Sequence, residues 1–226
     1  MGAPPPVVLG EHDGILAVDK PPGLPSTGRT LEDPQCLQWR LSERIGRRIW
    51  AVHQLDAETS GVNLFATRKS LVEPTVRRMR PPQGRKLYLA VCRGEPDFRV
   101  RSVREPIARL STARGSLLVA SPQGRPSRTD LRVLDSHRDF CLVQASIATG
   151  RTHQVRIHLA HVGLPIVGDT RYAPARREPS SRLALHSWTI VLAPTPGRVR
   201  FVVSSPPPED LARLCAHLGL DLPATS

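Results

Sequence analysis

The stretch VHQLDAETSG at residues 52–61 is a short polar loop that runs directly into the apolar stretch GVNLFA at residues 61–66. The apolar stretch alternates as a β-strand does, so the loop is expected to end at a strand. Asp56 is the central carboxylate of this loop. The hydroxyls of Thr59 and Ser60 could orient it, and Gly61 would permit a tight approach. An aspartate in a loop is equally often a turn or capping residue, so the sequence alone leaves both interpretations open.

Glu58 lies two residues after Asp56. In an extended loop the two carboxylates would point the same way and could form a general acid–base pair. In a turn they need not converge, so the pair depends on the conformation of the loop.

The segments around this loop predict an α+β fold. Strands are predicted at residues 15–18, 61–66, 87–91, 117–120, 129–134, 140–147, 188–192 and 199–203, and helices at 37–45, 151–162 and 207–218, with the end of a short helix at 75–80. The three strands between residues 117 and 147 are predicted to form a meander. Strands and helices do not alternate regularly, which favours a mixed, mainly antiparallel central sheet flanked by helices and loops over a doubly wound parallel sheet. We expect one domain over residues 1–226, with its core at about residues 10–205 and flexible ends.

The charge of the chain predicts a polyanionic partner. Lys and Arg number 32 against 20 Asp and Glu, a net charge of +12. Arginine, which predominates among the cations, forks onto phosphates and stacks on bases. A coding bias would explain the preference for arginine but not the net excess, so nucleic acid is the expected partner. Two basic runs contain no acid: residues 77–86, and residues 106–129 with Arg109, Arg114, Arg125 and Arg128.

Membrane and secretory classes are not expected. No apolar run approaches the ~18 residues that a membrane-spanning helix needs, and no basic amphipathic helix of any length appears. The first ten residues do not resemble a secretory signal. The four cysteines, Cys36, Cys92, Cys141 and Cys215, form no metal-binding pattern. We therefore expect buried thiols in a reducing cytoplasm.

A second segment, ATGRTHQVRIHLAH at residues 148–161, is rich in hydrogen-bond donors. It predicts a helix with Thr149 as its N-cap and an anion site at its first turn, near Arg151. His153, His158 and His161 could suggest a metal. Their spacing does not place all three on one helical face, and no acidic residue accompanies them. Histidines that pack in the core or bind RNA are therefore favoured over a zinc site.

A third segment, GRKLYLAV at residues 84–91, predicts a strand that opens with two cations. Alternation places Lys86 and Tyr88 on the same face of this strand. That arrangement is typical of a ring that stacks on a base beside a phosphate contact. A half-buried tyrosine on a sheet is an equally good interpretation of this segment alone.

Together these segments resemble the RluA family of RNA pseudouridine synthases, over nearly the whole chain. The similar segments are KPPGL at 20–24 (family K-P-x-G-L), HQLDAETSG at 53–61 (H-R-L-D-x-x-T-S-G), KLYLAV at 86–91 (the segment of the active-site Tyr), TGRTHQVR at 149–156 (T-G-R-[ST]-H-Q-[IL]-R), GLPIVGD at 163–169 with Tyr172, and RLALH at 182–186 (R-L-x-L-H). Several motifs in the family's order are a far more specific signal than any one of them. No S4-type RNA-binding domain precedes the first motif, so the chain resembles short members that hold only the catalytic domain.

The resemblance implies an enzyme that flips a uridine out of ribosomal or transfer RNA into a central RNA-binding cleft. It would cleave the N-glycosidic bond, turn the base and rejoin it through carbon 5, without a metal or any other cofactor. Asp56 would act at the ribose as nucleophile or base, and Arg156 would pair with Asp56 and lower its pKa. Tyr88 would stack on the uracil, and Glu58 becomes a variable position.

The resemblance also assigns RNA- or substrate-binding roles to His53, Gln54, Thr59, Lys86, Arg151, His153, Gln154 and Leu185. The expected enzyme is a cytoplasmic monomer that needs no protein partner and does not bind membranes.

Gln54 departs from the family pattern, which usually has Arg at this position. In RluA-like members that Arg enters the space left by the flipped base. Because Gln carries no charge, the efficiency of flipping or the choice of substrate is in question. Two alternatives follow: an RNA-binding pseudoenzyme without turnover, favoured by Gln54 alone, and a metal-dependent nuclease using the histidines, which lacks an acidic cluster.

Overall fold

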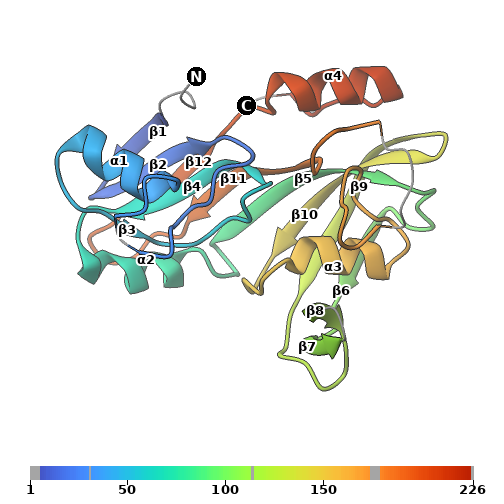
Figure 1. Cartoon of the computed structure of the whole chain (residues 1–226), viewed down its shortest axis with the longest axis horizontal. Coiled ribbons are helices and arrows are strands. Elements are labelled where there is room, and N and C mark those ends of the chain that lie inside the picture. Colours follow the sequence, from blue (N-terminus) through green and yellow to red (C-terminus); the bar gives the residue numbers. More distant parts are fainter. Residues whose placement is uncertain (1–5, 31, 113–114, 174–178, 225–226) are drawn as a thin grey trace. The chain divides into compact units, whose positions relative to one another are not determined.

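The computed structural model of the chain describes residues 6–30, 32–112, 115–173 and 179–224. The chain forms two units, a first unit of Met1–Lys86 with His186–Pro206 and a second unit of Leu87–Leu185 with Pro207–Ser226. The elements of both units are labelled in Figure 1. The prediction of a single domain over residues 1–226 stays a prediction.

The first unit is built on strands that are mostly antiparallel. β1 pairs with β2, β2 pairs with β4, and the short β3 also pairs with β4, all antiparallel. β11 runs parallel to β4, and β12 is antiparallel to β11, so the pairing is mixed as predicted. The elements are β1 (Val7–His12), β2 (Ile15–Lys20), α1 (Leu37–Ile45), β3 (Trp50–Ala51), β4 (Ser60–Ala66), a 3-10 turn (Lys69–Leu71), α2 (Val72–Arg78), β11 (Leu185–Leu192) and β12 (Phe201–Ser204).

Both faces of β2 and β4 are covered, which explains why these strands are apolar on both faces. Ile15 and Ala17 pack in one cluster with Leu71 of the segment that leads into α2. The alternate residues of β2, Leu16 and Val18, pack in a second cluster with Leu37 and Leu41 of α1. These two apolar clusters, one on each face of the sheet, therefore fix the position of β4, including its polar N-terminal end.

The second unit has four antiparallel strands in the order β5–β10–β9–β6, and β7 and β8 form a separate hairpin. Its elements are β5 (Arg85–Arg93), β6 (Val100–Val103), β7 (Ile107–Thr112), β8 (Gly115–Ala120), β9 (Thr129–His137), β10 (Phe140–Ile147), α3 (Gln154–His161) and α4 (Glu209–Leu218). The mainly antiparallel pairing in both units confirms the predicted α+β class.

Several details of the prediction were wrong, and β1, β3, β6 and β7 were not predicted. β8 pairs with β7 and not with β9, so the meander has two strands, β9 and β10, rather than three. The short α2 ends at Arg78 and not at residue 80. α3 begins at Gln154, because His153 has a left-handed backbone (φ 57°) that breaks the helix before it. Thr149 is therefore not its N-cap, and Arg151 does not lie in its first turn.

All four cysteines are buried and unbridged, as predicted. None of the helices in the described ranges is long and apolar enough to cross a bilayer.

Candidate active site

Asp56 lies on a tight turn just before β4. The amide of Thr59 donates to the carbonyl oxygen of Asp56 at 3.0 Å, which closes a four-residue turn. Asp56 is half-buried, and Glu58 is exposed. Because the backbone turns here, the two side chains do not alternate as they would in an extended loop. The acid–base pair of Asp56 and Glu58 required an extended loop, so that hypothesis was wrong.

Lys20 holds the peptide after Asp56. Its side chain is fully buried, and Nζ donates to the carbonyl oxygens of Leu24 and Ala57, each at 2.8 Å, and of Pro21 at 2.9 Å. The amide of Gly23 donates to the same Ala57 oxygen at 2.8 Å. A buried ammonium is tolerated only when its protons are bonded, so these carbonyls must stay where they are.

Ser26 holds the peptide before Asp56. Its Oγ accepts from the amide of Leu55 at 2.9 Å and donates to the carbonyl of Leu55 at 3.1 Å. Residues 20–26 therefore hold the backbone of the loop on both sides of Asp56. Such support fixes where a reactive carboxylate stands.

The start of β4 is anchored by Gly61 and Ser60. Gly61 has φ 103°, and a Cβ there would lie 2.2 Å from the carbonyl oxygen of Ser187 in β11. The group that approaches Gly61 closely is thus the backbone of β11. Ser60 Oγ lies 3.0 Å from Nδ1 of His186, and Nε2 of His186 lies 2.9 Å from the carbonyl oxygen of Ser205. A carbonyl only accepts, so Nε2 carries the proton and Ser60 donates to Nδ1.

His53 and Lys86 both have lowered pKa values. Nε2 of the half-buried His53 accepts from the amide of Leu64 at 3.2 Å. Burial, and next the charge of Lys86, lower the pKa of His53 to about 3, so the imidazole is neutral at working pH. Burial, and next the charge of Arg80, lower the pKa of Lys86 to about 8. The Lys86 ammonium therefore titrates within the range in which enzymes work.

Gln54 and Thr59 differ in exposure. Gln54 is exposed, and its Nε2 donates to Thr27 Oγ1 at 2.9 Å. Thr59 is buried within the turn. The structure therefore brings together Asp56, Gln54, Thr59 and His53 on one loop of the first unit, and a direct RNA contact is open to Gln54 in particular.

In the second unit, Tyr88 and Leu185 are buried residues of strands β5 and β11. Tyr88 lies opposite Ala145 of β10, whose small side chain leaves room for the ring. The stacking of Tyr88 on the uracil and the part of Leu185 in substrate binding remain proposals.

Arg156 is buried in α3 and forms a two-pronged pair with Asp169. Nε donates to Oδ2 at 2.8 Å, and Nη2 donates to Oδ1 at 2.9 Å. A guanidinium has five N–H donors, and this pair uses two of them. The pairing of Arg156 with Asp56 stays a prediction.

Gln154 organises the loop before α3. Its Oε1 accepts from Thr149 Oγ1 at 2.7 Å and from the Arg151 amide at 3.1 Å. Its Nε2 donates to the Arg128 carbonyl at 2.8 Å and to Thr129 Oγ1 at 3.0 Å. The amide is fully used inside the protein, so the predicted part of Gln154 in RNA binding would be indirect, through the placement of this loop.

The histidines of this segment have separate roles. His158 is fully buried, with Nδ1 2.8 Å from Thr129 Oγ1 and Nε2 2.9 Å from the Glu105 carbonyl. Burial is the largest cause that lowers its pKa. This confirms the packed-histidine interpretation for His158. Within the ranges that the structure describes, no group of three His, Cys, Asp or Glu side chains could hold a metal ion.

The sequence predicted no role for the residues that support the site, Lys20, Ser26, His186 and Asp169. Lys20, Asp169 and His186 stand in the motifs at residues 20–24, 163–169 and 182–186, and this is the signal that could have found them. Ser26 lies in none of these motifs, and its partner Leu55 is 29 residues away.

Comparison with known proteins identifies the family. The family model described as RNA pseudouridylate synthase matches residues 14–161. An uncharacterized RNA pseudouridine synthase of Chloroflexus aurantiacus is 38% identical over 162 residues, 71% of this chain and 50% of that protein. Ribosomal large subunit pseudouridine synthase C of Escherichia coli is 36% identical over 168 residues, 74% of this chain and 53% of that protein. The chain thus spans about half the length of these curated relatives.

Solved structures share the fold over nearly the whole chain. Human RNA Pseudouridylate Synthase Domain Containing 4 has a TM-score of 0.76 at 23% identity, covering 96% of this chain and 95% of that one. Human RNA Pseudouridylate Synthase Domain Containing 1 has a TM-score of 0.70 at 25% identity, covering 95% of this chain and 94% of that one. The resemblance predicted from the motifs is confirmed, and the chain belongs to the RNA pseudouridylate synthase family.

Proposed function

We propose that this chain isomerises uridine in RNA to pseudouridine, with Asp56 as the group that acts at the ribose. The observation that carries the proposal is the support of Asp56. The residues before and after it are held by Ser26, Lys20 and Gly23, and its side chain is half-buried. Preorganisation of this kind is what a reactive group needs, and an ordinary capping aspartate does not.

In the proposed reaction the carboxylate of Asp56 acts on the ribose as nucleophile or base, and the bond between N1 of uracil and C1′ breaks. The released base turns, a bond forms between C5 and C1′, and the hydrogen of C5 leaves as a proton. Tyr88 stacks on the uracil and Leu185 packs near it. Arg156 pairs with the carboxylate of Asp56 and orients it.

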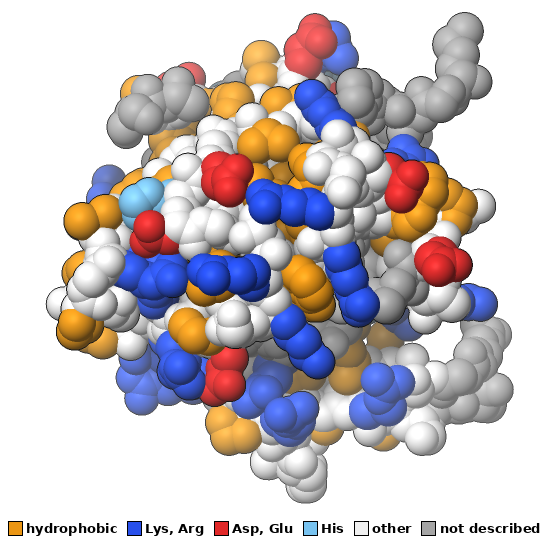
Figure 2. All heavy atoms as spheres, turned by 90° about the vertical axis from the view of Figure 1, so that its left-hand side faces the viewer, with side chains coloured by type: hydrophobic (Ala, Val, Ile, Leu, Met, Phe, Trp, Pro, Cys, Tyr) orange, Lys and Arg blue, Asp and Glu red, His pale blue; other side chains and the backbone are white. Residues whose placement is uncertain are grey.

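RNA is proposed to be held by many cations rather than by one. Figure 2 shows lysine and arginine side chains spread over one face of the molecule, with acidic side chains between them. Lys86, Arg151 and His153 join this set as proposed contacts to the substrate strand. Of the basic run at residues 106–129, Arg114 lies outside the described residues.

The proposed substrates are ribosomal RNA, transfer RNA or both, and the reaction needs no cofactor. The proposed form is a monomer that needs no protein partner. Four buried thiols suit a reducing compartment, so the cytoplasm is the proposed location.

Tritium release from RNA labelled at carbon 5 of uridine tests the proposal, since isomerisation must free that hydrogen. Bulk unmodified ribosomal RNA and transfer RNA are tested separately. Release from either supports the proposal and selects the RNA class. No release from either, with RNA binding intact, would leave an RNA-binding protein without turnover.

Gln54→Arg is expected to leave the tritium-release rate unchanged or to raise it. Gln54 is exposed, and its Nε2 forms an exposed hydrogen bond with Thr27 Oγ1 of another loop, so the fold should accept the longer side chain. The new guanidinium could fill the space of the flipped base, and flipping costs a few kcal/mol. Complete loss of activity in a folded Gln54→Arg protein would contradict a role of this position in flipping.

Lys86 should make RNA binding depend on pH. With a pKa of about 8 it is charged at pH 7 and mostly neutral at pH 9. Each lost phosphate contact reduces the slope of log affinity against log salt by about 0.7 to 0.9. The wild-type slope should fall by this amount between pH 7 and pH 9, whereas that of Lys86→Arg should not, because Arg stays charged. Equal changes of slope in the two proteins would refute the role of Lys86.

A further inference from the structure

Arg156 is locked into one orientation by a buried carboxylate. Arg156 and Asp169 are each only 3% exposed. The two bonds from Nε and Nη2 to the two carboxylate oxygens, at 2.8 and 2.9 Å, fix both the position and the plane of the guanidinium. An arginine side chain can rotate about several bonds, so the pair with Asp169 removes most of its conformational freedom.

Asp169 is itself held by the backbone. Its Oδ1 accepts from the amides of Arg171 at 2.9 Å and of Tyr172 at 3.0 Å. Burial alone would raise the pKa of Asp169, but the hydrogen bonds and charge of Arg156 and the two amides outweigh it and hold the pKa below its ordinary value. The carboxylate is therefore ionised and fixed before any ligand arrives.

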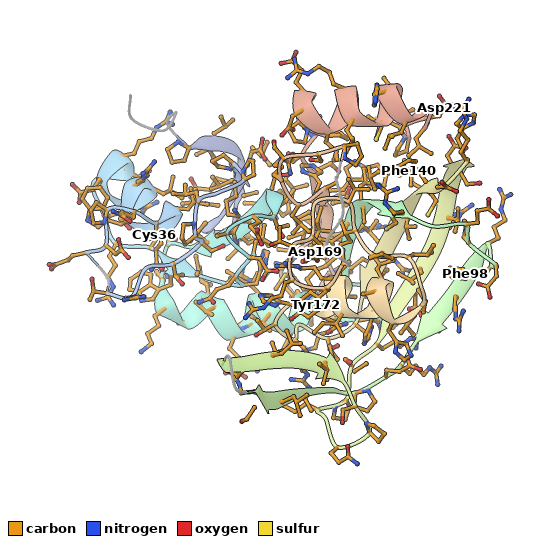
Figure 3. The ribbon with its side chains drawn as sticks, turned by 45° about the vertical axis from the view of Figure 1, so that its right-hand side comes forward. Cys36, Phe98, Phe140, Asp169, Tyr172 and Asp221 are labelled. Carbon is orange, nitrogen blue, oxygen red and sulfur yellow. The ribbon has the colours of Figure 1, made fainter. Side chains whose placement is uncertain are left out.

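Tyr172 supports the same guanidinium from its face. The Cζ atom of Arg156 lies 5.3 Å from the centroid of the Tyr172 ring, a cation–π contact. The Tyr172 hydroxyl lies 2.8 Å from Nδ1 of His153, the residue before α3. Figure 3 shows Asp169 and Tyr172 close together beside α3. Arg156 is thus held at its edge by one residue and on its face by another.

We propose that Asp169 is a positioning residue for Arg156 in the isomerisation, with Tyr172 as its second support. The inference rests on the proposed function, in which Arg156 acts on Asp56. Asp169 touches neither substrate nor Asp56 in this role. It sets where the positive charge of Arg156 stands, and it compensates that charge within the buried cluster.

Asp169→Asn is the selective test. The amide oxygen at the Oδ1 position can still accept from Arg171, Tyr172 and Nη2 of Arg156, but the new NH₂ at the Oδ2 position faces Nε–H of Arg156, so the second bond and the negative charge are lost. Misplacement of a group in the site can lower the rate by roughly 100-fold, so kcat for tritium release should fall about 10- to 100-fold. KM for RNA should change by less than about 3-fold, because binding is spread over many cations.

The split between kcat and KM separates positioning from a merely structural role. A displaced guanidinium lowers kcat while KM for RNA stays near the wild-type value, whereas a loosened fold would weaken RNA binding as well. An unchanged kcat, or a rise of KM that matches the fall of kcat, overturns the proposal.

Asp210→Asn is a matched control in the same unit. Asp210 forms the same two-pronged pair with Arg182, at 2.5 and 2.7 Å, and its Oδ1 also accepts from the Leu211 amide at 2.8 Å. Breaking this pair should leave kcat and KM at wild-type values. Equal loss of kcat in both variants would indicate general destabilisation and overturn the proposal.

Thermal unfolding shows whether each variant is folded. If Asp169→Asn does not fold, Tyr172→Leu takes its place, since it removes the ring under Arg156 without leaving a buried charge. It should lower kcat by a smaller factor than Asp169→Asn with KM near the wild-type value, and a wild-type kcat would overturn the proposal. If the wild-type protein releases no tritium, the proposed function is refuted. If the wild type is active and Asp169→Asn has the same kcat, only this inference is refuted.

Discussion

Asp56→Asn is expected to reduce turnover by at least about 10⁴-fold while RNA affinity stays near the wild-type value. Losses of this size are typical when the central group of a catalytic unit is removed. The amide has the shape of the carboxylate but can act neither as nucleophile nor as base. The turn should persist, because it is closed by the backbone oxygen of Asp56 and held by Lys20 and Ser26.

Single-turnover tritium release measures this loss, with RNA affinity and thermal unfolding measured on the same preparations. Glu58→Gln is the matched control, because it replaces an exposed carboxylate of the same turn by an amide. It should keep the wild-type rate. Substantial turnover by Asp56→Asn, or an equal loss in Glu58→Gln, would remove Asp56 from the centre of the reaction.

Gly61→Ala should have the largest effect on stability. The backbone at Gly61 has φ 103°, which side chains rarely adopt, and the new Cβ would stand 2.2 Å from the Ser187 carbonyl oxygen. Backbone cannot yield as a side-chain end can, so β4 and β11 would have to separate. Strain of the backbone costs about 1–3 kcal/mol, and the overlap adds to it. A loss of about 3 kcal/mol or more in the free energy of unfolding is expected from urea denaturation.

Gly197→Ala provides the comparison, also in the first unit. Gly197 has φ 75°, but a Cβ there would meet nothing within 4 Å. Only the left-handed backbone penalty of about 1–2 kcal/mol should remain. If the two alanine variants lost the same stability, the close approach of Gly61 to Ser187 would not be what restricts this position.

Local patterns made much of the fold predictable. Leu37 and Leu41 lie on one stripe of a helical pattern, and the helix has the predicted bounds, Leu37–Ile45. The alternating stretch after the Asp56 loop became β4, one residue longer than predicted. These signals depend on neighbours within a few residues, which the sequence displays directly.

Features set by distant partners were not predictable. The start of α3 depends on Gln154, whose side chain bonds to Arg128 and Thr129, some 25 residues earlier. β8 could pair with either of its neighbours in the sequence, β7 or β9. The connection between β7 and β8 is the shorter one, so this pairing costs less loop-closure entropy. Motifs placed Asp56 and Arg156 among the candidates. The hydrogen bond from Lys20 Nζ to the Ala57 carbonyl spans 37 residues, and the motif that contains Lys20 does not indicate this partner.

The nucleoside composition of reacted RNA tests the central claim most directly. Unmodified ribosomal and transfer RNA are incubated with wild-type protein, digested to nucleosides and separated by chromatography. The proposed isomerisation predicts that pseudouridine appears in the amount in which uridine disappears, at unchanged RNA length, and that Asp56→Asn forms none. Unchanged uridine in both RNAs despite binding, or shortened RNA without pseudouridine, would contradict it.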